Sequence, residues 1–310
     1  MKGCVVMVCI AKNQETRKPS TCDTIASIFV ANAAASGVQR GVLSLSGIPF
    51  KKIKNNKELT SDVYQRAINP VFEKMKLKEV GIELVDTQQV SEQEIAKCVK
   101  GGIPKFYEKI KPLKQFAEKM ADGQARQAKE GSNAFFVPHA KKIFVNNAKM
   151  PWTAFHEMGH ALNGKSKILK TMQKSGRMMP MLALIPLCVG IFKAKKEENE
   201  QPKNKFDKAT TFIKNNCGKL AFLPFVPMLF EEGLASVRGT KAAKEFLSKG
   251  EFKTLCKGNA AAWLTYLGMA TAISLSAVIG SKVRDFIGQK AKEKIDINIP
   301  VSSKLKSHQG

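Results

Sequence analysis

The sequence predicts an α+β fold that is mostly helical, with a small sheet in the middle of the chain and apolar helices in its second half. Apolar residues recur at helical spacing over 64–77 and 105–128, which indicates amphipathic helices. Ser91 and Glu94 form a capping-box pattern, which predicts the start of another short helix.

The predicted sheet comes from short runs rich in β-branched and aromatic residues at 80–85, 134–138 and 142–146. The last two runs are joined by a short turn around His139, and they lead directly into a further predicted helix. We expect His139 to be a surface residue of that turn rather than a metal ligand.

The most specific motif lies in this further helix, where His156, Glu157 and His160 form the pattern His-Glu-x-x-His. Residues four apart lie on one face of a helix, with Cβ atoms about 5–6 Å apart. Two imidazoles so placed can bind one Zn²⁺ at about 2.0–2.1 Å each. Glu157 lies about 100° round the helix, where it can accept a proton from a water that the metal activates. The alternative is an ordinary amphipathic helix with two surface histidines.

The residues around the motif are typical of a helix. Pro151 suits the first helical position, where its missing N–H is not needed. Asn163 and Gly164 suit the end, because both tolerate the left-handed conformation. Gly159 destabilises a helix by about 1 kcal/mol relative to alanine. One reason to tolerate it is a close neighbour, such as a second helix that carries a metal ligand.

Two histidines leave a third protein ligand to be found. A metzincin has a glycine and then a third histidine just downstream, but here those positions are Asn163 and Ser166. A peptide deformylase adds an upstream cysteine in a Glu-Gly-Cys motif, which the surroundings of Cys98 do not match. A gluzincin takes a glutamate from a second helix downstream, and the chain has Glu231 and Glu232 there.

The sequence His-Glu-Met-Gly-His-Ala, followed by Glu232-Gly-Leu-Ala-Ser, resembles the two-part zinc signature of the gluzincin metallopeptidases. The second part is similar to the Asn-Glu-Gly-Phe-Ala motif of the aminopeptidase N type. It is also similar to the Glu-x-x-Ala-Asp motif of the membrane-embedded gluzincins, which include the CAAX prenyl proteases. The resemblance implies a zincin-like catalytic core, with Glu232 as the third zinc ligand and Glu231 as the alternative. It also implies that the edge strand of the sheet pairs with the substrate backbone.

The chain departs from this signature at Ser236, where many gluzincins have an aspartate that supports a ligating histidine. The sequence therefore does not show which group accepts a hydrogen bond from the ligating histidine. Taken alone, the pair Glu231 and Glu232 is also what a helix N-terminus favours. The family often stabilises the oxyanion with a Tyr, His or Arg after the third ligand, and Arg238 and Tyr266 are the candidates for this role.

The chain is strongly basic, with 51 basic residues against 26 acidic ones and a net charge of +25. Such a charge attracts anionic lipid surfaces, nucleic acid or acidic substrates. A nucleic-acid partner is disfavoured, because arginine-rich blocks with interleaved aromatics are absent from the sequence. A solvated, lysine-rich exterior is the alternative explanation.

The cysteines are odd in number and form no Cys-x-x-Cys pair, which favours reduced thiols in a protein that faces the cytosol. The apolar run before Lys12 is short and makes a poor signal peptide. The seven cysteines stand at positions 4, 9, 22, 98, 188, 217 and 256.

Three apolar segments follow the histidine motif, at 178–192, 220–230 and 258–281. The first two are shorter than the about 20 residues of a spanning helix, and they contain prolines that break helices. The third is long enough to span, but its many small residues suit a buried soluble helix equally well. We expect the first two segments to be buried in the protein or to dip into one leaflet of a membrane, because the lysine-rich linker between them resists translocation. The sequence leaves open whether the third segment spans a membrane.

These observations predict a basic, largely helical region at 1–130, a zincin-like metallopeptidase core at 131–290 and a polar tail at 291–310. The leading hypothesis is a membrane-associated or cytoplasmic peptidase that uses one catalytic Zn²⁺ and acts on a peptide or protein substrate. The alternative is a non-catalytic, basic membrane-surface protein with a degenerate or structural zinc site. The sequence leaves the cleavage specificity and the oligomeric state open.

Overall fold

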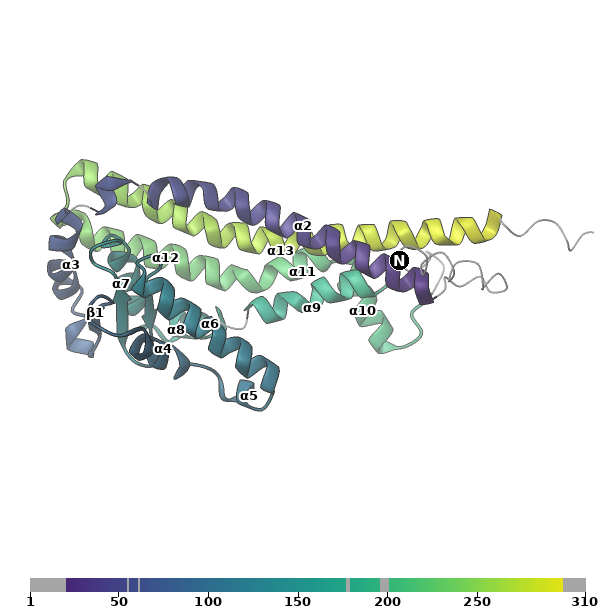
Figure 1. Cartoon of the computed structure of the whole chain (residues 1–310), viewed down its shortest axis with the longest axis horizontal. Helices are drawn as coiled ribbons and strands as arrows, with labels where there is room; N and C mark the ends of the chain where they lie inside the picture. Colours follow the sequence, from purple (N-terminus) through teal and green to yellow (C-terminus); the bar gives the residue numbers. More distant parts are fainter. Residues whose placement is uncertain (1–20, 55, 61, 177–178, 196–200, 298–310) are drawn as a thin grey trace, which may run out of the picture. The chain divides into compact units, whose positions relative to one another are not determined.

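The structure is a computed structural model that describes residues 21–54, 56–60, 62–176, 179–195 and 201–297. These residues are mostly helical, with one small three-stranded sheet, as the sequence predicts (Figure 1). The N-terminal run before Lys12, Cys4 and Cys9 lie outside the described residues. The expected polar tail at 291–310 is described only as far as Ile297, where the last helix ends.

The chain divides into two compact units, each assembled from separate stretches of sequence. Of the described residues, the first contains those within 46–176 and 225–267, and the second contains those within 21–45, 179–224 and 268–297. Residues 46–130, which the sequence analysis assigned to a separate region, therefore belong to the same unit as the histidine motif.

The sheet of the first unit has the strand order β1-β3-β2, with β2 at one edge. β2 (Phe135–Val137) runs antiparallel to β3 (Lys142–Val145), which confirms the predicted pair of strands around His139. β1 (Glu83–Asp86) runs parallel to β3. It begins later than the predicted run at 80–85, because a 3-10 turn precedes it and ends at Gly81, whose φ is 76°.

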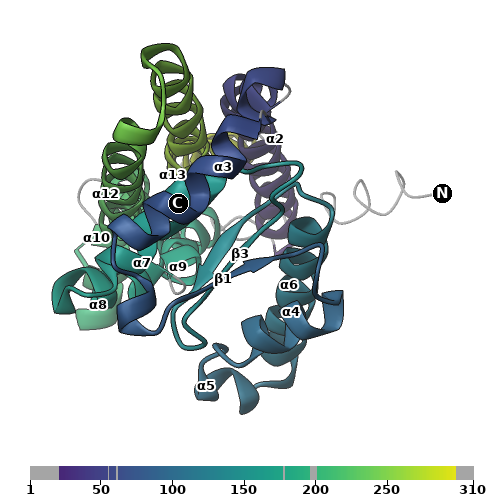
Figure 2. The same ribbon diagram turned by 90° about the vertical axis from the view of Figure 1, so that its left-hand side faces the viewer.

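The two faces of the sheet bury different sets of side chains, because successive residues of a strand point in opposite directions. Ile143 and Val145 of β3 belong to the main core, together with Trp152 and Phe155. Phe144, between them, packs into a second core beneath α4 (Glu92–Lys100) and α6 (Lys111–Lys129). The sheet is therefore covered by helices on both faces, as Figure 2 shows.

The helices expected in this part of the chain are present. α3 (Asp62–Lys74) covers most of the predicted helix at 64–77, and α4 begins with the predicted capping box of Ser91 and Glu94. The predicted helix at 105–128 is divided into α5 (Lys105–Glu108) and α6, because a proline stands in the first turn of α6.

The histidine motif lies on α7 (Thr153–Asn163), and the acidic pair lies on α12 (Val226–Ala243). α7 begins two residues after Pro151, which stands in the preceding turn. The prediction for the helix end is corrected in one respect: Gly164 follows the helix in a right-handed conformation, with φ of −59°.

Two glycines bring the backbones of α7 and α12 together. A Cβ atom at Gly159 would lie 2.0 Å from the carbonyl oxygen of Ala235, and one at Gly239 would lie 1.8 Å from that of Phe155. Neither glycine could be replaced by alanine without a clash, because there is no room for a methyl group at either position. The expectation that Gly159 makes room for a second helix that carries a candidate ligand is confirmed.

The second unit includes α9 (Met179–Phe192), α10 (Lys205–Asn215), α11 (Cys217–Phe222) and the end of α13 (Lys249–Ile297). Its buried Lys214 forms an ion pair of 2.8 Å with Asp285 and donates a hydrogen bond of 2.9 Å to the Gly190 carbonyl. The partners are needed because an unpaired buried ammonium is costly.

The predicted apolar segments are helical. α9 begins at Met179 and continues through Pro186 to Phe192, so the expectation that prolines break this helix is wrong. The prolines of 220–230 fall at the change from α11 through a 3-10 turn to α12. Among the described residues, Cys217–Phe246 and Lys249–Lys290 are long and apolar enough to cross a membrane, a test that core helices of soluble proteins also pass.

Candidate metal centre

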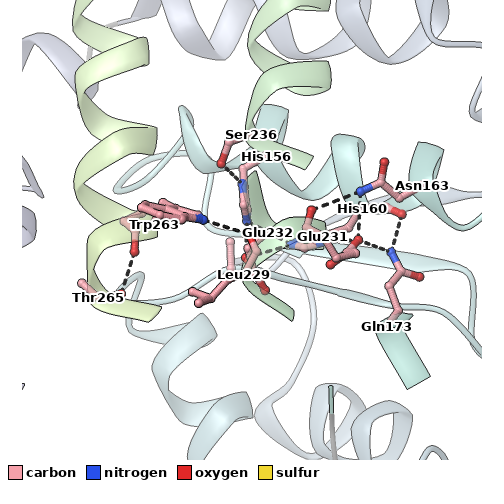
Figure 3. A network of polar contacts seen from close by, with 12 residues as sticks. His156, His160, Asn163, Gln173, Leu229, Glu231, Glu232, Ser236, Trp263 and Thr265 are labelled. Atoms are coloured by element: carbon pink, nitrogen blue, oxygen red, sulfur yellow. Dashed lines mark hydrogen bonds and ion pairs between the residues drawn. The ribbon is translucent and has the colours of Figure 1, made fainter. Parts of the chain in front are cut away.

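Three side chains from α7 and α12 converge on one point. His156 and His160 project from α7, and Glu232 projects toward them from α12 (Figure 3). The two imidazole rings lie edge to face, with centroids 4.5 Å apart. These are the three ligands predicted from the sequence, where Glu232 was preferred to its neighbour Glu231.

The distances between the donor atoms suit a single small metal ion. His156 Nε2 and His160 Nε2 are 3.0 Å apart, and they lie 3.2 and 3.4 Å from Glu232 Oε2. Bonds of about 2.0–2.1 Å in a tetrahedral zinc site place any two donor atoms about 3.3 Å apart. The three atoms therefore form a nearly equilateral triangle of the size that one tetrahedral face requires.

The hydrogen bonds of the other ring nitrogens leave both Nε2 atoms available as ligands. His160 Nδ1 lies 2.9 Å from Glu231 Oε1, and because a carboxylate can only accept, this nitrogen carries the proton. His156 Nδ1 lies 2.9 Å from Ser236 Oγ, a hydroxyl that can accept in the same way. A neutral imidazole protonated at Nδ1 has its lone pair at Nε2, as a metal ligand requires.

Glu231 is therefore not a rival ligand but the partner of one. Its Oε1 atom accepts hydrogen bonds from His160 Nδ1, Asn163 Nδ2 at 2.9 Å and Gln173 Nε2 at 2.8 Å. Burial alone raises the pKa of Glu231, but these donors outweigh it and lower the pKa below its usual value. An ionised Glu231 orients His160 and increases its basicity as a ligand.

This arrangement answers the doubt that Ser236 raised. Ser236 occupies the position of the expected aspartate and bonds to His156, while the carboxylate behind the other histidine comes from Glu231. Both rings are thus held in place from behind. Glu231 and Glu232 also lie in the second turn of α12 rather than at its N-terminus, so a preference of helix ends for acidic residues does not explain them.

The electrostatics of the cluster favour a cation. Burial raises the pKa of Glu232, but the charges and hydrogen bonds of His160 and His156 outweigh it and hold the pKa far below its usual range. Burial lowers the pKa of His160, yet the charge of Glu232 and the bond with Glu231 raise it well above its usual value. The carboxylates of Glu231 and Glu232 therefore stabilise a positive charge at this point, and a bound metal ion supplies one.

The cluster opens into a cavity of about 290 Å³. Glu157 lies in its wall, is only 6% exposed, and interacts through its carboxyl group with the backbone N–H of Phe136 on the edge strand β2. Burial raises the pKa of Glu157 above its usual value, and the nearby histidines oppose this only in part. The remaining walls come from residues 124, 133–136 and 138, from 172, 173 and 176, and from 228, 231, 232 and 266.

Of the other residues considered in the sequence, Tyr266 lies at the cavity, whereas Arg238 and His139 do not line it. Tyr266 lines the cavity beside Glu232, whose charge adds to burial in raising the pKa of the phenol well above its usual value. Arg238 donates a hydrogen bond of 2.7 Å to Asn163 Oδ1, and it is not among the residues that line the cavity. His139 is exposed and contacts the Cys98 carbonyl, away from the cluster.

The comparisons with known proteins do not assign a class. No protein-family model, curated protein or solved structure matches this chain.

Proposed function

We propose that this protein is a zinc-dependent peptidase of gluzincin type with a zincin-like core, associated with a membrane. The observation that carries the proposal is the triangle of donor atoms from His156, His160 and Glu232, with each imidazole held at Nδ1 by a separate partner. Three protein ligands beside an open cavity favour a catalytic site, because structural zinc sites are usually closed by a fourth protein ligand.

His156, His160 and Glu232 would hold the metal. A zinc ion in this position supplies a Lewis acid that polarises a carbonyl oxygen and lowers the pKa of a water. Glu157 faces the same cavity, and its raised pKa suits a group that accepts a proton from the attacking water and later donates it to the leaving amine.

The cavity also offers groups that can orient a peptide. β2 is an edge strand, and its residues Phe135 and Phe136 line the cavity, so an extended substrate can add to the sheet there. Tyr266 lines the same cavity beside Glu232, where its hydroxyl can donate a hydrogen bond to an oxyanion. The apolar side chains of Met172 and Met228 complete a wall that suits an uncharged substrate residue.

The proposal is tested by the substitution Glu157→Gln, assayed on a mixed peptide library. We expect peptide cleavage to be abolished while one zinc remains bound per chain, because the amide keeps the shape of Glu157 but cannot accept the proton. A variant that retains wild-type cleavage rates would remove Glu157 from its role as the base.

The second candidate is a non-catalytic, basic membrane-surface protein with a structural zinc site. The net charge of +25 and the two long apolar helices favour it. The library assay with and without a chelator separates the two functions, because only a peptidase produces cleavage that the chelator abolishes. Sedimentation with membranes after alkaline extraction tests the membrane association that both candidates share.

A further inference from the structure

A second hollow lies between α12 and α13 and shares no lining residue with the cavity at the metal cluster. Its volume is about 610 Å³, within the range of about 300–1,000 Å³ that small-molecule sites occupy. We refer to it as the hairpin groove. On α12 its lining residues are Gly233, Ser236, Val237, Thr240, Lys241 and Lys244, and on α13 they are Phe252, Cys256, Asn259, Ala260 and Trp263.

The hairpin groove is long and mostly apolar. The lining residues of each helix extend over twelve positions, and the eleven rises between them correspond to about 17 Å of α-helix. Val237, in its wall, is 62% exposed. The Trp263 indole N–H is already bonded to the Leu229 carbonyl at 2.9 Å, so it presents its apolar ring to the groove.

The charged groups of the groove lie at one end only, and both are cationic. Lys241 and Lys244 are exposed residues of the lining, near the turn between the two helices. The Lys244 ammonium lies 5.9 Å from the centre of the Phe252 ring, which is also in the lining. The groove thus offers two positive charges at one end of an apolar trough.

One buried polar group of the groove lacks a partner. Asn259 is 3% exposed, and its Nδ2 atom donates a hydrogen bond of 2.7 Å to Thr240 Oγ1. Its Oδ1 atom is buried without a hydrogen-bond partner. Buried acceptors of this kind are rare in folded proteins, and a hydroxyl group of a ligand would satisfy this one.

We infer that the hairpin groove binds one acyl chain of an anionic phospholipid, with its headgroup at Lys241 and Lys244. An acyl chain needs no hydrogen bonds along the apolar trough, whereas an extended peptide backbone would leave its N–H and C=O groups unpaired there. The two ammonium groups complement a phosphate, and Asn259 can accept from a headgroup hydroxyl. The site deepens the proposed membrane association, but lipid binding requires neither zinc nor hydrolysis.

The inference is tested with the full chain and vesicles of phosphatidylcholine, prepared with and without phosphatidylglycerol that carries a photoreactive group in its acyl chain. After irradiation, mass spectrometry locates the lipid adducts. We expect adducts on Val237 and on the segment from Cys256 to Trp263. Adducts spread evenly over the exposed apolar residues of the chain would overturn the inference.

Two variants sharpen the test. Ala260→Trp places a large side chain at an exposed position of the lining, so we expect it to remove the groove adducts while zinc stoichiometry and thermal unfolding stay unchanged. Lys241→Gln combined with Lys244→Gln should weaken binding of the anionic lipid about 30-fold. Its matched control is Lys253→Gln combined with Lys257→Gln, which removes the same charge from exposed positions outside the lining.

Three further outcomes contradict the inference. An equal loss of binding in the control pair would mean that the lysines act only through net charge. Displacement of the probe by an uncharged apolar peptide, but not by unlabelled lipid, would assign the groove to a protein segment. A dimer in sedimentation that Ala260→Trp dissociates would assign it to a second copy of this chain.

Discussion

The substitution Gly239→Ala tests whether the contact between α7 and α12 determines the metal site. A Cβ atom at this position would lie 1.8 Å from the Phe155 carbonyl oxygen and 2.5 Å from its carbonyl carbon. Real Cβ contacts are essentially never shorter than 3.0 Å. The two backbones must therefore separate by at least about 1.2 Å, because neither contact atom belongs to a flexible side chain.

This displacement is large compared with what a zinc site tolerates. Zinc–ligand distances hold within about ±0.2 Å, whereas α12 carries Glu232 and Ser236 away from α7. We expect zinc affinity to fall at least about 100-fold, beyond the upper end of the loss seen when supporting groups are removed. Overpacking should also destabilise the fold by about 1–3 kcal/mol, partly offset by about 1 kcal/mol of helix propensity.

The assay is competition for zinc against a chromogenic chelator, combined with thermal unfolding of the metal-free protein. Gly123→Ala on α6 is the matched control, because a Cβ atom there meets nothing within 4 Å. The control should bind zinc normally and unfold at the same or a higher temperature. If Gly239→Ala binds zinc as tightly as the wild type and is no less stable, the reasoning about the helix contact fails.

Three further predictions concern the site and its support. Glu231→Gln and Ser236→Ala should each weaken zinc binding about 10–100-fold, measured by the same competition; unchanged affinity would mean that these bonds do not orient the histidines. A chelator should lower the melting temperature of the wild type but not of Glu232→Ala, since only a protein that binds the metal gains stability from it; equal shifts would contradict this. The Lys129 ammonium donates to three backbone carbonyls at distances of 2.8–3.1 Å. Lys129→Met should therefore lower the free energy of unfolding, measured by urea denaturation, by about 1.5–3 kcal/mol. The control is Lys119→Met, at an exposed position of the same helix, which should show almost none of this loss.

The sequence predicted the part of the fold that depends on local patterns. Hydrophobic periodicity located α3 and α6, the capping box located the start of α4, and β-branched runs located β2 and β3. The division into two units was not predictable in this way, because contacts between distant segments define it. The continuation of α9 through Pro186 was missed for a related reason, since local propensity does not include tertiary packing.

The candidate site was predictable where spacing alone determines it. His156 and His160 share a helix face by their separation of four residues, and Gly159 signalled a close neighbour correctly. The supporting groups were not predictable, because Asn163 and Gln173 reach Glu231 only through the packing of their helices against α12. Gly239 could have been predicted as a second close contact, because it is a glycine inside the helix that carries the acidic pair. The sequence prediction did not include it.

The most direct test of the site is the zinc content of the purified protein, measured for the wild type beside Glu232→Ala and Glu231→Ala. We predict one zinc per chain in the wild type, almost none in Glu232→Ala, and zinc that is bound more weakly in Glu231→Ala. A wild type that holds no zinc, or a Glu232→Ala variant that keeps a full equivalent, would contradict a metal centre built from two imidazoles of α7 and one carboxylate of α12.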